Sequence, residues 1–341
     1  MNTTSFTDCS PIFVVGAGRS GTTLLQLMLN AHPQIAIAGE LGFFDEILLL
    51  RSKIPDLDTP ETIDQLFALL PSVDRYKYLT EAEAVFPAAR ARLKADPAPS
   101  YEKLYRYILE SYATLRGARR FGEKTPGNIR HLEALVSIFP NCRVVHVVRD
   151  PRSNVASRRK LPMLSKDVIT NTIKWDVDIY CGISFMQKHK QNYFEINYEK
   201  LVLEPAITLK QVCQFLDETF DDRMLEYYRS SEEYIKDEPW KNGTQKPVYR
   251  SSIETWRNEL SEGQIYLIES IAGRQMARYG YTRSAVRFRA KLLSPLQAAR
   301  ELFRWGQHKR WERKVRQRAP ATIHATNTKL YHLLWRALVQ R

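Results

Sequence analysis

The chain has 341 residues, 44% of them hydrophobic, and a formal net charge of +13 at pH 7. This length suits one large domain with appendages. The sequence contains neither a recognisable secretory signal nor a run of the ~18 apolar residues that a membrane-spanning helix needs. The four cysteines are scattered and form no C-x-x-C pair. We therefore expect reduced thiols and a cytoplasmic protein.

The first predicted element is a strand over residues 11–16, which runs into a glycine-rich turn and an apolar helix over 22–31. The stretch VVGAGRSGTTLL (14–25) matches the phosphate-loop spacing G-x-x-x-x-G-K-[ST] except at Thr22, which replaces the lysine. Backbone N–H groups of such a turn form a positive pocket for a phosphate. Without the lysine, the loop is poorly suited to a Mg-nucleotide triphosphate. A plain strand–helix turn is the alternative.

A second strand is predicted over residues 34–39, directly before Glu40. Its carboxylate should emerge at the same sheet edge as the glycine-rich turn, although a role in capping the next helix is the alternative. From about Ile47 to Gly117 the pattern is helical, with helices over 60–70 and 101–115. This segment interrupts the strand pattern and is predicted to form a cap over the sheet edge.

Lys124 follows a short predicted strand in FGEKTP, and Glu123 beside it should point to the other side. A helix is predicted over 128–139 and a strand over 142–148. Arg149 ends that strand, and Ser157 lies two turns into the following helix. The two side chains can meet at one anion near the carboxyl edge of an open sheet. Alternatively, Arg149 pairs with Asp150 and Ser157 faces solvent.

The last predicted strand covers residues 193–197 and leads into Tyr198, and a helix is predicted over 206–216. Alternating strands and helices favour an α/β fold with a mainly parallel sheet that helices cover on both faces. We therefore predict a P-loop-like domain over residues 1–281, with the helical cap at about 47–117.

The excess positive charge lies in residues 282–341, which contain fifteen Lys or Arg and two acidic residues. Apolar residues recur there at helical spacing: Leu292, Leu296, Ala299 and Phe303, then Leu330, Leu334 and Leu338. Basic amphipathic helices with Trp and Tyr are typical of membrane-surface elements. We expect a helical tail that binds an anionic membrane surface and holds the protein on the inner face of a membrane. A helical extension packed on the core is the alternative, and no nucleic-acid-binding module is recognised.

Three stretches, RSGTTLLQLMLNAHPQI, RVVHVVRDPRSNVAS and NYEKLV, resemble the sulfotransferases that use 3′-phosphoadenosine 5′-phosphosulfate (PAPS). The likeness covers about residues 11–280 and is strongest to the tyrosylprotein sulfotransferase-like and bacterial branch. It implies PAPS as co-substrate and no metal. Because PAPS has no γ phosphate, the absence of the phosphate-loop lysine is then expected.

The resemblance also implies roles for individual residues. The loop for the 5′-phosphosulfate would comprise Arg19, Ser20, Gly21, Thr22 and Thr23. Arg149 and Ser157 would bind the 3′-phosphate, and Tyr198 would contact the nucleotide. Sulfuryl transfer needs a base for the acceptor hydroxyl and a cation at the leaving group. Glu40 would be that base and Lys124 that cation, with Arg19 a second candidate.

The likeness is incomplete in the second half of the chain. QKPVYRSSIETW keeps the spacing of the family's closing loop, which makes Lys246 and Arg250 candidate nucleotide contacts. Trp240, however, stands where that loop has a catalytic serine, and Leu161 stands where the branch has a basic residue. Trp256 is as compatible with the core as with the site.

The sequence therefore predicts a PAPS-dependent sulfotransferase. The acceptor hydroxyl could belong to a carbohydrate, a lipid-linked glycan, a small alcohol or phenol, or a peptide tyrosine. A nucleotide kinase-like phosphotransferase is one alternative, against which Thr22 argues. A catalytically silent PAPS-binding or membrane-adaptor protein is another.

Overall fold

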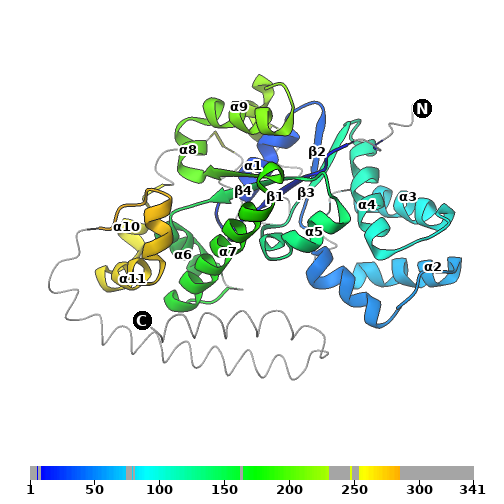
Figure 1. Cartoon of the computed structure of the whole chain (residues 1–341), viewed down its shortest axis with the longest axis horizontal. Helices are drawn as coiled ribbons and strands as arrows, with labels where there is room; N and C mark the ends of the chain where they lie inside the picture. Colours follow the sequence, from blue (N-terminus) through cyan, green and yellow to red (C-terminus); the bar gives the residue numbers. More distant parts are fainter. Residues whose placement is uncertain are drawn as a thin grey trace.

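The structure is a computed structural model, which describes residues 6, 9–73, 79, 81–161, 164–229, 246–247 and 253–284. Five strands form one sheet in the order β2-β3-β1-β4-β5, and neighbouring strands are parallel throughout. The strands are β1 (Ile12–Val15), β2 (Ile35–Ala38), β3 (Arg120–Lys124), β4 (Arg143–Val148) and β5 (Tyr193–Asn197). The expected α/β fold with a mainly parallel sheet is confirmed (Figure 1).

Helices cover both faces of the sheet because its strands alternate their side chains between two apolar clusters. In β1, Ile12 and Val14 pack into one cluster, whereas Phe13 and Val15 pack into the other. The first cluster includes side chains of α1 (Thr22–Asn30), α8 (Tyr198–Leu203) and α9 (Pro205–Leu216); the second includes those of α4 (Tyr101–Leu115), α5 (Leu132–Ile138) and α7 (Val168–Lys188). The core therefore has two layers, one on each side of the sheet.

A helical segment lies between β2 and β3, where the sequence predicts the cap. Its elements are η1 (Phe43–Ile47), η2 (Leu48–Ser52), α2 (Pro60–Leu69), η3 (Leu70–Ser72), α3 (Ala82–Ala95) and α4. α4 packs against both β2 and β3, and α2 and α3 lie beyond it (Figure 1). This segment therefore rests on the half of the sheet from which Glu40 and Lys124 emerge.

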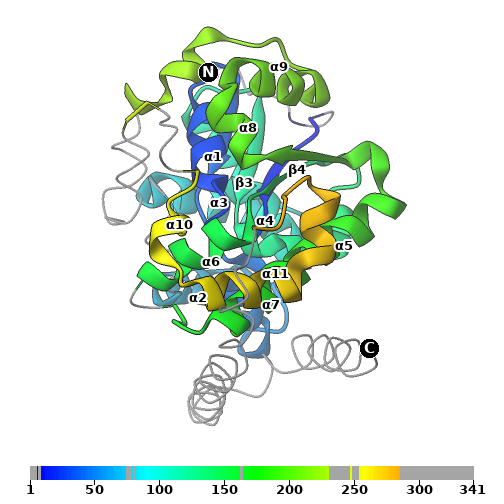
Figure 2. The ribbon, with the colours of Figure 1, turned by 90° about the vertical axis from the view of Figure 1, so that its left-hand side faces the viewer.

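Two helical regions differ from the sequence-based expectation. The helix expected over residues 128–139 is broken at His131, whose dihedral angles (φ −118°, ψ 17°) are not helical. A 3-10 turn, η5 (Pro126–Arg130), precedes this break, and α5 follows it. The sequence pattern did not predict α7 or α11 (Glu262–Arg278), which pack against each other and against α6 (Pro151–Lys160) (Figure 2).

The shorter described elements that remain are η6 (Lys190–Asn192), η7 (Asp222–Arg229) and α10 (Trp256–Glu259). Arg250, Trp240 and the amphipathic pattern expected after residue 284 lie outside the described residues. Within the described ranges, no helix is both long and apolar enough to cross a bilayer. The same ranges contain no group of three His, Cys, Asp or Glu side chains that could hold a metal ion.

Candidate active site

The glycine-rich turn joins the end of β1 to the start of α1, and side chains of α6 hold its backbone. Asn154 Nδ2 donates to the Gly18 carbonyl oxygen (2.9 Å) and to Ser20 Oγ (3.1 Å). Arg158 Nη1 donates to the same Gly18 oxygen (3.3 Å). Because α1 begins at Thr22, directly after the turn, the first N–H groups of this helix have no intrahelical partner. The turn therefore presents the donors that an anion requires.

Four of the side chains that the sequence singles out converge at this turn. Arg149 directly follows β4, and its Nη1 donates to the carbonyl oxygen of Arg19 (3.1 Å). Arg19, which has a positive φ of 77°, donates from Nε to Ser157 Oγ on α6 (3.2 Å). The Arg149 guanidinium lies 4.3 Å from the ring centroid of Tyr198, within the range of a cation–π contact. Two guanidinium groups, a hydroxyl and an aromatic ring thus meet at the carboxyl ends of β1, β4 and β5.

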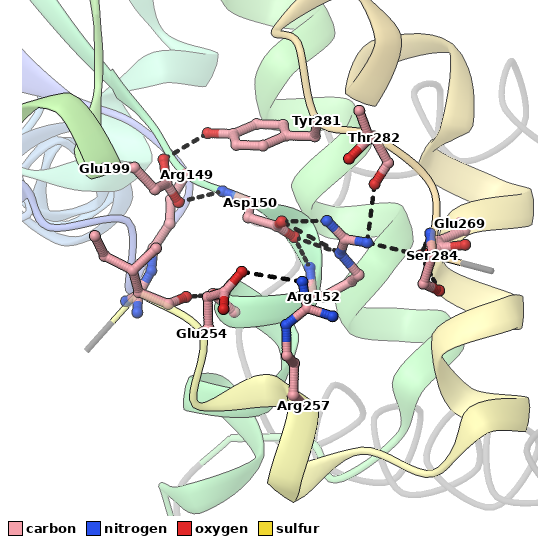
Figure 3. A network of polar contacts seen from close by, with 12 residues as sticks. Arg149, Asp150, Arg152, Glu199, Glu254, Arg257, Glu269, Tyr281, Thr282 and Ser284 are labelled. Carbon is pink, nitrogen blue, oxygen red and sulfur yellow. Dashed lines mark hydrogen bonds and ion pairs between the residues drawn. The ribbon is translucent and has the colours of Figure 1, made fainter. Parts of the chain in front are cut away.

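The carboxylate of Asp150, next to Arg149, pairs with Arg152. Arg152 Nε donates to Asp150 Oδ1 (3.0 Å) and Nη2 donates to Oδ2 (2.6 Å). Such bidentate Arg–carboxylate pairs are among the strong hydrogen-bonded ion pairs. Arg152 Nη1 also donates to Glu269 Oε1 on α11 (2.7 Å). Figure 3 shows Arg152 turned toward Asp150 and Glu269. Both oxygens of Asp150 are thus engaged by Arg152, while the Arg149 side chain extends to the glycine-rich turn.

Glu199 links the end of β4 to the C-terminal part of the described chain. Its Oε1 accepts from the N–H of Asp150 (3.1 Å), and its Oε2 accepts from the Tyr281 hydroxyl (2.8 Å). Burial raises the pKa of the Glu199 carboxyl, and these hydrogen bonds oppose the rise. Arg152 Nη1 donates to the carbonyl oxygen of Thr282 (3.1 Å) (Figure 3). The frame around Arg149 (Asp150, Arg152, Glu199, Glu269, Tyr281 and Thr282) therefore includes residues that are more than 130 positions away from it in the sequence.

Glu40 and Lys124 form an ion pair at the same edge of the sheet. Lys124 is the last residue of β3, opposite Val14 of β1, and Glu40 lies two residues beyond β2. Lys124 Nζ donates to Glu40 Oε1 at 2.7 Å. The Lys124 side chain is only 1% exposed, whereas that of Glu40 is 18% exposed. The glutamate therefore remains accessible to a second molecule, and the lysine places a buried positive charge behind it.

The surroundings of this pair join it to the glycine-rich turn. The N–H of Gly16, the first residue of the turn, donates to the carbonyl oxygen of Pro126 (3.2 Å), two residues after Lys124. The helix that follows Glu40 begins after Gly42, which is its N-cap residue. Paired acidic and basic side chains in a partly buried site of this kind are candidates for proton transfer and charge stabilisation.

The other candidates of the sequence analysis are placed differently. Lys246 is exposed, and its carbonyl oxygen accepts from the Tyr227 hydroxyl (2.7 Å). Trp256 is buried at the start of α10, where the Arg152 guanidinium lies 4.1 Å from its ring centroid. Ser153 Oγ on α6 donates to the carbonyl oxygen of Ile253 (2.7 Å). Trp256 thus packs against the frame of Arg149 and not at the glycine-rich turn.

Sequence reasoning missed two residues that hold the turn, Asn154 and Arg158. A local signal for them exists, because residues three and four positions apart on a helix share one face. Once Ser157 was placed at the turn, Asn154 at i−3 could have been placed there as well. Arg158 lies four residues after Asn154 on the same helix and reaches the same carbonyl oxygen. Glu199 and Tyr281 gave no local signal, since they contact each other across 82 positions.

The parallel sheet and the glycine-rich turn at its carboxyl edge define an α/β protein of the phosphate-loop type. The chain belongs to the sulfotransferase family, whose model matches residues 11–222. Among solved structures, the sulfotransferase domain from the curacin biosynthetic pathway has the same fold, with a TM-score of 0.59 and 20% identity. That likeness covers 81% of this chain and 99% of that domain.

Curated relatives agree with this family. The chain is 25% identical over 293 residues to protein-tyrosine sulfotransferase A of Caenorhabditis elegans. This match covers 80% of this chain and 68% of the nematode protein. It is 27% identical over 256 residues to an uncharacterised protein of Aquifex aeolicus (strain VF5), which covers 72% of this chain. The match spans 30% of the length of the Aquifex protein. Family and fold together support sulfuryl transfer as the chemistry of this chain.

Proposed function

We propose that this chain is a sulfotransferase that uses PAPS as the sulfuryl donor. The observation that carries the proposal is the meeting of Arg19, Arg149 and Ser157 at the glycine-rich turn, with the Glu40–Lys124 pair at the same sheet edge. This donor set suits a nucleotide with two separate anionic groups. The turn would hold the 5′-phosphosulfate, while Arg149 and Ser157 would hold the 3′-phosphate.

The reaction assigns one task to each member of the ion pair. The acceptor hydroxyl oxygen attacks sulfur in line, a new S–O bond forms, and the bond to the bridging oxygen breaks. Glu40 accepts the hydroxyl proton. Lys124 Nζ offers positive charge to the bridging oxygen, which leaves with the 3′-phosphoadenosine 5′-phosphate product. The 2.7 Å contact between the two side chains would then be exchanged for contacts to the two reacting groups.

An acceptor screen with sulfur-labelled PAPS tests this proposal. Tyrosine-containing peptides are the first acceptors to try, because a curated relative is named a protein-tyrosine sulfotransferase. Carbohydrates, lipid-linked glycans, and small alcohols and phenols complete the panel. We expect the unmodified protein to move label to one class and the Glu40→Gln variant to move almost none. Label transfer from γ-labelled ATP instead would favour the phosphotransferase. Tight PAPS binding without transfer to any acceptor class would favour the silent binding protein.

Gly21 provides a test of the arrangement around the nucleotide. Its φ is 95°, and a Cβ there would lie 2.2 Å from Cδ2 of Tyr198. We expect Gly21→Ala to displace the Tyr198 ring and with it the stacked Arg149, which should weaken binding of 3′-phosphoadenosine 5′-phosphate about 10-fold. Gly117→Ala is the matched control, since Gly117 also has a positive φ (64°) but a Cβ there meets nothing within 4 Å.

Both glycine variants should unfold at lower urea concentration, because a left-handed alanine costs about 1–3 kcal/mol. Only Gly21→Ala should lose nucleotide affinity in a calorimetric titration. Equal affinity in the two variants would show that Tyr198 is not a nucleotide contact.

The basic segment after Ser284 is proposed to bind anionic membrane surfaces. All of the net positive charge of the chain falls in residues 282–341, and each Lys or Arg near an anionic bilayer contributes about 1 kcal/mol. We expect the full chain to sediment with anionic vesicles and not with neutral ones, and to be released by salt. A packed extension of the core would leave the protein in the supernatant with both.

The design of the truncated control follows from two contacts. The Thr282 carbonyl oxygen accepts from Arg152, and the Ser284 N–H donates to Glu269 Oε1 (2.9 Å). The chain should therefore be cut after Ser284, so that the frame around Arg149 stays complete. This truncated protein should lose vesicle binding and keep its nucleotide affinity.

A further inference from the structure

Glu123 is a buried acid that has no part in the chemistry described above. It immediately precedes Lys124 in β3, and its relative exposure is 0%. Successive strand residues point to opposite sides, and the Glu123 carboxylate accordingly lies on the α4 side of the sheet, where the Tyr105 hydroxyl donates to it. Burying an ionised carboxyl group costs folding free energy unless its oxygens accept hydrogen bonds.

Four donors from three segments of the chain meet this one carboxylate. Oε1 accepts from the N–H of Leu41 (3.0 Å) and from the Thr125 hydroxyl. Oε2 accepts from the Tyr105 hydroxyl and from Asn128 Nδ2 (3.2 Å). Burial raises the pKa of Glu123, and the hydrogen bonds from Thr125, Tyr105 and Leu41 oppose the rise.

The positions of these donors relate Glu123 to the ion pair. Leu41 directly follows Glu40, and Thr125 directly follows Lys124. The carboxylate therefore ties the chain just after the glutamate to the chain just after the lysine. Tyr105 makes a second contact with the segment after Glu40, because its ring is stacked on that of Phe43 at 4.1 Å between centroids. The segment that presents Glu40 is thus held both at a backbone N–H and at an aromatic ring.

We propose that Glu123 is a positioning residue, which fixes the Glu40 carboxylate against Lys124 by anchoring the segment after Glu40 to the end of β3. The inference rests on the proposed role of Glu40 as general base. A glutamine of the same size cannot replace Glu123, because its amide nitrogen would face donors where the carboxylate has an accepting oxygen. An apolar residue would leave all four donors without this acceptor.

The first experiment measures the anchor without any assay of activity. Hydrogen exchange of the Leu41 amide is compared between the unmodified protein and Glu123→Gln. We expect exchange on the order of 10-fold faster in the variant, because the amide loses a charged acceptor. Glu110→Gln is the matched control: Glu110 is another buried acid of the α4 layer, but it pairs with Arg92 and Arg106. Unchanged Leu41 exchange in Glu123→Gln would overturn the proposal.

The second experiment asks whether Glu123 acts through Glu40. Glu123→Gln should lower kcat about 10²-fold, since a misplacement of about 1 Å can cost that much, and should change nucleotide affinity by less than about 3-fold. In a Glu40→Gln background, the same substitution should lower the residual rate by less than about 3-fold. A merely structural role would give the same fold-loss in both backgrounds, and that result would overturn the proposal.

A milder variant covers the case in which Glu123→Gln does not fold. Tyr105→Phe removes one donor and keeps the carboxylate and the stacked ring. It should give a smaller loss of kcat with the same dependence on Glu40, and full activity in this variant would count against the proposal. Failure of the proposed function can be told apart from failure of this inference. If Glu40 is not the base, Glu40→Gln alone will show near-normal turnover. The Leu41 exchange rate will still report whether Glu123 holds the segment after Glu40.

Discussion

Replacing Glu40 by glutamine should lower turnover by about 10²- to 10⁴-fold, the range in which a general base contributes. The amide keeps the shape of the side chain and an oxygen for Lys124 Nζ, but it cannot accept the acceptor's proton. Nucleotide affinity should stay close to that of the unmodified protein, because the residues proposed to bind the nucleotide follow β1, β4 and β5 or lie on α6, and not after β2. A transfer assay beside an isothermal titration measures both quantities.

Glu61→Gln is a suitable control for this experiment. Glu61 is an exposed acid in the first turn of α2, so its substitution removes one negative charge from the cap without touching the ion pair. Turnover in Glu61→Gln should be normal. If Glu40→Gln also retained near-normal turnover, Glu40 would be a structural partner of Lys124 and not the base.

The second large effect is expected at Arg149. A charge-assisted hydrogen bond contributes about 1.5–3 kcal/mol, or roughly 10- to 100-fold in affinity. Arg149→Ala should therefore reduce the preference for 3′-phosphoadenosine 5′-phosphate over 5′-AMP by that factor. The ratio of the two affinities is the useful quantity, because loss of the contacts to Tyr198 and to the Arg19 carbonyl oxygen affects both nucleotides.

Arg143→Ala serves as the matched control for Arg149→Ala. Arg143 is the first residue of β4, at the opposite end of the strand, where it donates to Asp217 Oδ2 (2.7 Å). Its removal should leave the preference between the two nucleotides unchanged. An equal reduction in both variants would mean that net charge, and not the position of Arg149, sets the preference.

Much of the candidate site could be predicted because parallel strands end at a common edge. Residues that follow β1, β2, β3 and β4 in the sequence, among them Arg19, Glu40 and Arg149, are brought together by that rule alone. The pairing of Glu40 with Lys124 could not be derived from local patterns. It depends on β2 and β3 lying side by side, although Glu40 and Lys124 are 84 positions apart in the sequence.

α7 shows why part of the fold escaped sequence analysis. Hydrophobic periodicity identifies a helix that has one apolar face and one polar face. α7 instead buries polar residues as well as apolar ones: Thr170, Asn171 and Asp178 are all buried. Their partners explain the pattern, since Asn171 Oδ1 accepts from Arg158 and Asp178 Oδ1 accepts from Arg130. Because the buried residues of α7 are both polar and apolar, no simple apolar stripe marks this helix in the sequence.

Glu123 illustrates the same limit within the site. Strand alternation predicts that the side chains of Glu123 and Lys124 point to opposite faces of the sheet, and in the structure the Glu123 carboxylate lies on the α4 face. Its four donors, however, come from the segment after β2, from α4 and from the segment after β3. Because these segments are distant in the sequence and meet only in the folded chain, no local sequence pattern predicts this network.

The most direct measurement is a calorimetric comparison of three nucleotides with the unmodified protein: 3′-phosphoadenosine 5′-phosphate, 5′-AMP and Mg-ATP. The turn lacks the phosphate-loop lysine, and Arg149 and Ser157 are the proposed pair for a 3′-phosphate. We therefore expect 3′-phosphoadenosine 5′-phosphate to bind about 10- to 100-fold more tightly than 5′-AMP, and Mg-ATP to have no advantage over 5′-AMP. Equal affinity for 3′-phosphoadenosine 5′-phosphate and 5′-AMP, or a clear preference for Mg-ATP, would contradict PAPS as the sulfuryl donor.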